Sequence, residues 1–218
     1  MNREREWIDI SVPLSTGMVH YPGDSVVQIE HEQDIARGDV ATVSRVCLSA
    51  HSGTHVDAPL HFCEKGRAID QCPFDAITGR ARVIQIRDDE SIKPSELETS
   101  GIKPGDILLF KTRNSRLWSD ESFNRNYVYL STAAALLLAQ KKVRTIGIDY
   151  LSIGGFEGNE VEAHRILLEA SIWIIEGLNL SSAPPGVYEF VCLPLRIAGG
   201  EAAPARAIIR PLSRVPRS

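Results

Sequence analysis

Long hydrophobic runs are missing from this 218-residue sequence, in which the longest purely apolar stretch is Ala133–Ala139. A membrane-spanning helix needs about 20 apolar residues, so the sequence predicts no transmembrane segment. The charge-rich start, Met1–Glu6, leads into no apolar segment, and we therefore expect no secretory signal. These absences predict a soluble protein located in the cytoplasm.

Cysteine and positive charge are scarce as well. The four cysteines form no Cys-x-x-Cys pair, and in a chain without an export signal we expect buried thiols rather than disulfides. The 24 Lys and Arg residues are outnumbered by 28 Asp and Glu residues, which gives a formal net charge of −4. Nucleic-acid-binding domains usually show a clustered basic face, so neither nucleic acid nor a membrane is an expected partner.

The remaining composition is that of a globular protein, and no repeat or polar linker divides it, so we expect one domain over residues 1–218. Helices are predicted over Thr132–Lys142 and Val161–Ala170. Alternating or β-branched patterns predict strands over Trp7–Val12, Val26–Ile29, Val43–Ser49, Arg82–Ile86, Asp106–Phe110, Thr145–Asp149, Ile172–Ile175, Val187–Leu195 and Ala205–Ile209. The pattern at Ile172–Ile175 also fits a helix continuing through Leu178. The predicted fold class is α/β and β-rich.

One segment concentrates groups that bind metals. Three of the six histidines, His51, His55 and His61, lie within eleven positions, and Asp57 lies among them. Imidazole nitrogen and carboxylate oxygen are ligands that suit zinc, manganese and iron. Buried polar groups need partners, so a bound metal explains this cluster better than packing in a core does.

The spacing within this segment indicates how the ligands would meet. Gly53 and a nearby proline disfavour a helix here. In an extended stretch His55 and Asp57 project to the same side, and a turn at the glycine can fold His51 back toward them. Because the segment follows the predicted strand Val43–Ser49, we expect it at the end of that strand.

Two acidic residues further along the chain have two interpretations each. Glu176 closes the apolar run Ile172–Ile175, where a carboxylate is either a metal ligand or a strand end that meets solvent. Asp149 ends another predicted strand. It either caps the end of that strand or orients a histidine that binds the metal.

The segment His51–Phe62 resembles the signature of the cyclase-like metal-dependent hydrolases, the family of bacterial kynurenine formamidase and isatin hydrolase. Further matches extend along nearly the whole chain, at Asp9–Ser11 with Leu14, Tyr21–Asp24, Gly147–Asp149, His164, Glu176–Leu178, Leu193–Leu195 and Pro204–Ala207. The resemblance implies a compact fold of the swivelling β/β/α type. It also implies a homodimer or homotetramer in which an N-terminal segment reaches a neighbouring site, with Trp7 and Met18–Tyr21 as the candidate arm.

The functional residues of the family can be carried over one by one. The resemblance implies that one or two divalent ions, Zn²⁺ or Mn²⁺, are held by His51, His55, Asp57, His164 and Glu176. It implies that Asp57 is able to bridge two ions and that His61 is the catalytic proton donor and acceptor. Tyr21 and Phe62 are expected to line the substrate pocket, with Trp118 as a further candidate wall.

The implied activity is hydrolysis of amide C–N bonds by a metal-activated water, with an arylformamide of the N-formylkynurenine type as substrate and tryptophan breakdown as the best-known setting. Two positions depart from kynurenine formamidase: Tyr21 stands where that enzyme usually has tryptophan, and Tyr150–Ile153 differs from its Thr-Pro-Ser pattern. These departures leave open a cyclic amide such as isatin as the substrate. A metal- or ligand-binding module without activity is the non-enzymatic alternative, and a structural zinc site with four protein ligands is the least favoured.

Overall fold

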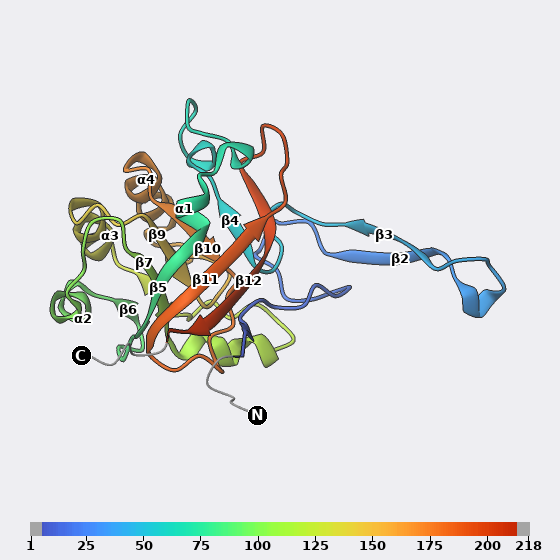
Figure 1. Cartoon of the computed structure of the whole chain (residues 1–218), viewed down its shortest axis with the longest axis horizontal. Helices are drawn as coiled ribbons and strands as arrows, with labels where there is room; N and C mark the ends of the chain where they lie inside the picture. Colours follow the sequence, from blue (N-terminus) through green and yellow to red (C-terminus); the bar gives the residue numbers. More distant parts are fainter. Residues whose placement is uncertain (1–5, 213–218) are drawn as a thin grey trace.

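A closed β-sheet forms the centre of the chain, whose computed structural model describes residues 6–212 (Figure 1). The strands follow the order β1 (Ile8–Asp9), β12 (Ala202–Pro211), β11 (Gly186–Pro194), β5 (Thr78–Gln85), β7 (Ile107–Lys111), β9 (Thr145–Ile148), β10 (Trp173–Glu176) and β4 (His55–Asp57). β4 pairs with β10 on one side and with β12 on the other, so the sheet closes on itself like a barrel. β5, β7, β9 and β10 run parallel to one another.

Apolar residues fill both sides of the parallel strands. Within β7, Ile107 and Leu109 belong to one hydrophobic core cluster, and Leu108 and Phe110 belong to the other. Successive side chains of a strand point to opposite faces, so a strand buried on both faces reads as a continuous apolar run. This explains why these four positions are all hydrophobic.

The main helices lie beside this sheet and contribute to the second core cluster. α3 (Thr132–Gln140) begins after Ser131, whose hydroxyl accepts a hydrogen bond from Ala134 N at 3.2 Å. α4 (Glu160–Glu169) packs against α3. The smaller elements are α1 (Phe74–Ile77), α2 (Pro94–Leu97) and a separate pair of strands, β6 (Ser91–Ile92) and β8 (Tyr129–Leu130).

The predicted α/β, β-rich fold class is confirmed by this arrangement. Both helices were predicted to within two residues at each end. The ambiguous run Ile172–Ile175 is a strand, because it pairs in parallel with β9 and is buried throughout as part of β10.

A two-stranded arm extends far from the rest of the chain (Figure 1). It consists of β2 (Gln28–Gln33) and β3 (Val43–Cys47), which pair with each other and with no other strand of residues 6–212. Every residue of β3 is exposed, and so is every residue of β2 except the half-buried Ile29. The apolar side chain of Val46 on β3 and that of Val40, between the two strands, are left in solvent.

Val19 and Tyr21, in the candidate arm Met18–Tyr21, pack against the buried Tyr150 and its neighbours in the same chain, and the reach of this segment to a neighbouring site stays a prediction. One expectation from the sequence is wrong. The cysteines are free, but Cys47 lies exposed on β3 rather than buried. Within residues 6–212 no helix is long and apolar enough to span a bilayer. The segment on which the absence of a secretory signal was argued lies outside the described residues, apart from Glu6.

Candidate metal centre

β4 brings the first two candidate ligands into the interior of the molecule. His55 and Asp57 alternate with Val56 along this strand, and all three are buried. Val56 packs in the hydrophobic core, so the histidine and the aspartate project from the opposite face of the strand. The expectation that the motif lies at the end of the strand Val43–Ser49 is wrong, because the motif forms its own strand in the main sheet whereas β3 belongs to the arm.

The register of β10 against β4 places Glu176 opposite His55. Directly opposed residues of paired strands share a face, and Glu176 Oε2 lies 3.3 Å from His55 Nε2. The other carboxylate oxygen, Oε1, accepts a hydrogen bond from Ile153 N at 2.6 Å. Glu176 is buried, so it is not a strand end that meets solvent.

α4 contributes His164, which is also buried. Its Nδ1 lies 2.8 Å from the carbonyl oxygen of Glu160, and its Nε2 lies 3.1 Å from Glu176 Oε1. In the same way, His55 Nδ1 lies 2.9 Å from the carbonyl oxygen of Gly53. A carbonyl acceptor at Nδ1 fixes the orientation and tautomer of each ring, as is typical of histidines that bind a metal through Nε2.

His51 reaches the same place from the turn that precedes β4. Its Nδ1 lies 3.0 Å from Asp57 Oδ1, so the chain folds back as the spacing predicts. Gly53 in this turn has a φ of +62°, a conformation that favours glycine. The turn lies directly against Gly177. A Cβ atom added at Gly177 would lie 2.0 Å from the carbonyl oxygen of Gly53 and would clash with it. The glycine after β10 therefore permits the close approach of the loop that carries His51.

The candidate donor atoms form two overlapping groups. One group is His51, His55 and Asp57, and the other is Asp57, His164 and Glu176. Within each group the donor atoms all lie within 4.8 Å of one another, and Asp57 is common to both. The fold thus brings together all five predicted ligands from β4, β10, α4 and one loop, and their role as ligands stays a prediction.

Three potential metal-binding atoms in this cluster are buried and make no well-aligned hydrogen bond among the described residues: His55 Nε2 and both carboxylate oxygens of Asp57, although His51 Nδ1 approaches Asp57 Oδ1 to 3.0 Å. Leaving a buried polar atom unsatisfied costs about 1–3 kcal/mol, and more when it is charged. A cation between these atoms would satisfy all three, because imidazole nitrogen and carboxylate oxygen are ordinary metal ligands. The residues present therefore fit a divalent ion.

Protons and a metal would compete for the same donors. Burial lowers the pKa of His51, but the Asp57 carboxylate outweighs burial and raises it to about 9. Burial also disfavours the charged form of His164, whereas the neighbouring Glu176 raises its pKa to about 9. The metal-free cluster therefore holds protons at neutral pH that a metal ion must displace.

His61 stands beside the cluster and belongs to neither group of donors. It closes the 3₁₀ turn Pro59–His61, and its ring centroid lies 4.3 Å from that of His51 and 4.4 Å from that of Phe62. Burial lowers the pKa of His61, so the ring is neutral at pH 7 and has a nitrogen free to accept a proton. Its part in proton transfer stays a prediction.

A cavity of about 190 Å³ opens onto the cluster. Besides His51, His61, His164 and Glu176, its lining consists of Tyr21, Asp24, Phe62, Leu151, Ser152 and Glu160. Both predicted substrate-contacting residues, Tyr21 and Phe62, are among them. Asp24 lies in a turn, since its N–H donates a hydrogen bond to the carbonyl oxygen of Tyr21 at 3.0 Å. The sequence analysis did not predict Glu160 as a cavity residue. Its position four residues before His164, at the start of a predicted helix, places both side chains on one face, which could have indicated it.

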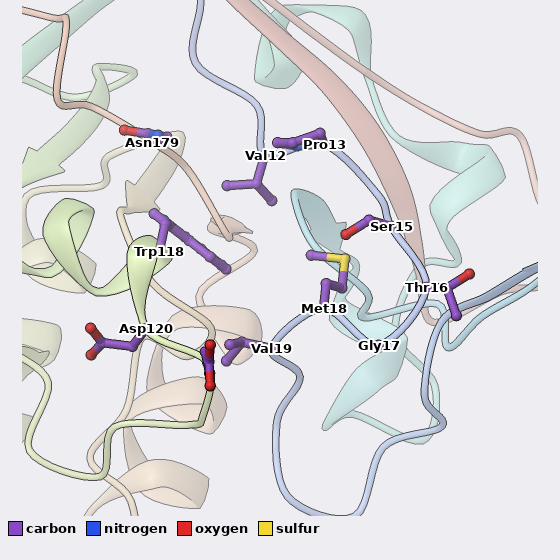
Figure 2. Close-up of a pocket in the computed structure, with 11 residues that line it drawn as sticks. Val12, Pro13, Ser15, Thr16, Gly17, Met18, Val19, Trp118, Asp120 and Asn179 are labelled. Carbon is purple, nitrogen blue, oxygen red and sulfur yellow. The ribbon is translucent and has the colours of Figure 1, made fainter.

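Trp118 lies elsewhere. Its indole Nε1 donates a hydrogen bond to the carbonyl oxygen of Leu178 at 2.9 Å. Figure 2 shows the ring across a separate cavity of about 430 Å³ from the loop Val12–Val19, and this second cavity contains none of the candidate metal ligands. The expectation that Trp118 forms a wall of the substrate pocket is therefore wrong.

Asp149 does not contact the cluster either. Its carboxylate accepts hydrogen bonds from the backbone N–H and the hydroxyl of both Thr112 and Ser115, at 2.6 to 3.1 Å. Through these hydrogen bonds Asp149, at the end of β9, holds the segment that follows β7 in place. Of its two interpretations, the structural one is confirmed.

The chain resembles known proteins over most of its length. Residues 8–154 match the model of the Cyclase family, described as "Putative cyclase". A kynurenine formamidase of Salinibacter ruber is 36% identical over 211 residues, which cover 93% of this chain and 96% of the relative. A kynurenine formamidase of Bacillus cereus is 33% identical over 207 residues, which cover 95% of this chain and 98% of the relative.

Solved structures share the fold. A protein from Bacillus stearothermophilus described as a "predicted metal-dependent hydrolase" has a TM-score of 0.81 at 32% identity, and the match covers 94% of this chain and 97% of that protein. An isatin hydrolase bound to thioisatinate has a TM-score of 0.81 at 20% identity, and the match covers 94% of this chain and 92% of that protein. The second likeness is one of fold alone.

Proposed function

Because this chain belongs to the Cyclase family, we propose that it is a metal-dependent hydrolase of amide C–N bonds, and specifically an arylformamidase. One observation carries the proposal: five side chains of metal-ligand type converge, and three of their buried atoms, His55 Nε2 and both carboxylate oxygens of Asp57, make no well-aligned hydrogen bond among the described residues. A second feature favours an enzyme over a binding module, because His61 lies beside these donors without being one of them. Two relatives whose matches cover 93% and 95% of this chain are kynurenine formamidases.

His51, His55, Asp57, His164 and Glu176 would hold the metal, as one or two ions of Zn²⁺ or Mn²⁺. A divalent ion bound there would supply Lewis-acid chemistry for activating water and polarising the carbonyl group of the substrate. The chain itself keeps the donors in place, since the carbonyls of Gly53 and Glu160 orient two of the imidazole rings.

His61 moves the proton in this reaction. In its neutral form the ring accepts a proton from water while the water oxygen bonds to the carbonyl carbon. The same proton then passes to the amide nitrogen as the C–N bond breaks, so that a formamide yields an amine and formic acid, which loses its proton to solvent and becomes formate. General acid–base catalysis of this kind contributes about 10²–10⁴-fold to the rate.

Tyr21 and Phe62 hold the aromatic part of the substrate, because both line the cavity next to the cluster. The second candidate substrate is a cyclic amide such as isatin. The small cavity and the departures at Tyr21 and Tyr150–Ile153 from the kynurenine formamidase pattern favour a compact ring.

A cytoplasmic homodimer or homotetramer is part of the same proposal. The arm supports it, because an isolated two-stranded hairpin is marginally stable in water. The exposed apolar side chains Ile35, Val40 and Val46 on the arm gain a stable environment only when another surface covers them. A second copy of the chain, with its own arm, is that surface.

The proposed activity is tested on protein stripped with a chelator and reloaded with Zn²⁺ or Mn²⁺. The expected result is metal-dependent release of formate from N-formylkynurenine. Opening of isatin without formamide hydrolysis would favour the second candidate. A protein that binds the metal and hydrolyses neither compound would be a binding module.

A further inference from the structure

A third cavity lies at the carboxyl ends of β5 and β7, the parallel strands that end at Gln85 and Lys111. This strand-end cavity has a volume of about 600 Å³, and its lining contains none of the five candidate metal ligands. The metal cluster includes Glu176 at the carboxyl end of β10, and β9 separates β10 from β7 in the sheet. The carboxyl ends of parallel strands are a common place for ligands, so the strand-end cavity is a candidate for a second binding site.

Positive charge is concentrated in the lining of the strand-end cavity. The lining includes one carboxylate, that of Asp89, and four cationic side chains, which are those of Arg87, Lys111, Arg113 and Arg116. This excess is opposite in sign to the formal net charge of the whole chain, which is −4. None of the four cations forms an ion pair within residues 6–212, whereas Arg82 on β5 lies 3.2 Å from Asp106. The positive charge of the cavity is thus left largely unbalanced.

Two of the four cations are fixed in position by neutral partners. Lys111 Nζ donates hydrogen bonds to the carbonyl oxygens of Ala183 at 2.9 Å and Ser181 at 3.1 Å. Arg113 donates through Nε to the carbonyl oxygen of Asp89 at 3.2 Å, and through Nη2 to that of Asn126. Carbonyl groups orient these side chains but do not cancel their charge. An ammonium has three N–H donors and a guanidinium has five, so both side chains keep donors for a ligand.

The buried carboxylate of Asp149 does not replace the missing counter-charge. It is occupied by hydrogen bonds from Thr112 and Ser115, two buried residues of the cavity lining. The charge of Asp149 raises the pKa of Lys111, but burial outweighs it and the pKa is lowered. An anion bound in the cavity would favour the charged form of Lys111.

We propose that the strand-end cavity binds a small molecule through a multiply charged phosphate group, such as a diphosphate. The four cations come from the segments that follow β5 and β7, and they surround a single space. A singly charged anion would leave most of this charge unbalanced, whereas a diphosphate carries several charges on adjacent groups. Arginine donates two parallel hydrogen bonds to phosphate oxygens, which suits this ligand class. The volume is within the range of about 300–1,000 Å³ that is usual for small-molecule sites.

Calorimetric titration of the zinc-loaded protein with pyrophosphate tests the site. We expect saturable binding with a Kd below about 1 mM that weakens as the salt concentration rises. Arg87→Gln and Arg116→Gln each remove an exposed cation and should weaken binding by about fivefold, and the double variant by about 25-fold. Arg80→Gln is the matched control, because Arg80 is an exposed arginine of β5 that does not line the cavity. This variant should bind pyrophosphate like the original protein.

Two further arms identify the place and the ligand class. Pyrophosphate also coordinates divalent ions, so the Asp57→Asn protein, which is expected to lose its metal, is titrated in parallel and should retain binding. Malonate, a dicarboxylate with fewer charges, should bind at least about fivefold more weakly than pyrophosphate. Adenosine diphosphate should bind too. A higher affinity than that of pyrophosphate would show that the phosphate group belongs to a larger molecule, and an equal affinity would show that the diphosphate is sufficient.

Four results would overturn the proposal. The first is the absence of saturable binding, and the second is unchanged binding in the double variant. The third is an equal loss of affinity in Arg80→Gln, which would indicate attraction to the general surface charge. The fourth is loss of binding in Asp57→Asn, which would place the pyrophosphate at the metal. Malonate that binds as tightly as pyrophosphate would contradict the assignment to phosphates. None of these results depends on amide hydrolysis, so the proposal stands or falls independently of the proposed function.

Discussion

Two strands that lie close together in the sequence have opposite surroundings. β3 is exposed along its whole length although it carries Val43 and Val46, whereas β4 is buried along its whole length although it carries His55 and Asp57. Each strand inverts the usual rule that apolar groups are buried and ionisable groups are exposed. Exposed apolar groups and buried ionisable groups both destabilise a folded protein. Each strand therefore indicates a binding partner that would cover or pair with these groups.

The partners differ in kind. For β4 the unsatisfied atoms are an imidazole nitrogen and two carboxylate oxygens, which call for a metal ion. On β3 and the rest of the arm the exposed groups are aliphatic. Their partner would be an apolar surface, such as that of a second copy of the chain. The predictions below test whether the two strands differ in this way.

The largest effect is expected from Asp57→Asn, which removes the ligand common to both donor groups. The variant should lose its bound metal and at least about 10³-fold in kcat/KM, since outer partners alone cost 10–100-fold when lost. Elemental analysis and formate release measure the two quantities. Glu32→Gln on β2 is the matched change on the arm and should alter neither. An Asp57→Asn protein with full metal content would contradict the assignment of β4.

His61→Ala should separate binding from chemistry. The variant is expected to keep its metal, because His61 belongs to neither donor group, and to lose about 10²–10⁴-fold in kcat. The same two measurements apply as for Asp57→Asn. Unchanged turnover would show that His61 takes no part in the mechanism. Loss of the metal would show that His61 is a metal ligand.

Removing the metal should destabilise the body of the molecule. Metal present at 100 times its dissociation constant stabilises the folded state by about 3 kcal/mol, so chelation should lower the melting temperature measured by calorimetry. The Asp57→Asn protein should show no response to the chelator. A response in that variant equal to the original one would place the metal elsewhere.

The smallest effect on activity is expected from Val46→Glu on the arm. A charge at this exposed apolar position should shift the protein to a smaller assembly while the metal content stays the same, as judged by light scattering and elemental analysis. Leu136→Glu, at an exposed apolar position on α3, serves as the control and should leave the assembly intact. An unchanged mass for Val46→Glu would mean that the arm is not an interface between copies.

Local patterns in the sequence were enough to predict the body of the fold. α3 has a capping serine and a run of good helix formers, and the strands β7 and β9 are short apolar runs, so each was placed to within two residues. The patterns of β2 and β3 are also those of packed strands. Nothing in them shows that the hairpin leaves the body, because that depends on what the rest of the chain covers.

The candidate site could be predicted in part. The spacing of His51, His55 and Asp57 indicated an extended segment with a turn, and this local geometry is what the structure contains. That the segment is a central strand between β10 and β12 could not be predicted, because buried ionisable residues contradict the pattern of a core strand. Asp24 was missed as a cavity residue because only the tertiary fold brings its turn to the metal cluster.

The most direct test of the account is anomalous diffraction from crystals of the protein grown with Zn²⁺ or Mn²⁺ and recorded at the absorption edge of the added metal. We expect a peak within bonding distance of His55 Nε2 and the Asp57 carboxylate, at about 2.0–2.2 Å for zinc. Crystals that show those side chains without a peak between them, or with the metal bound at another place, would contradict the account.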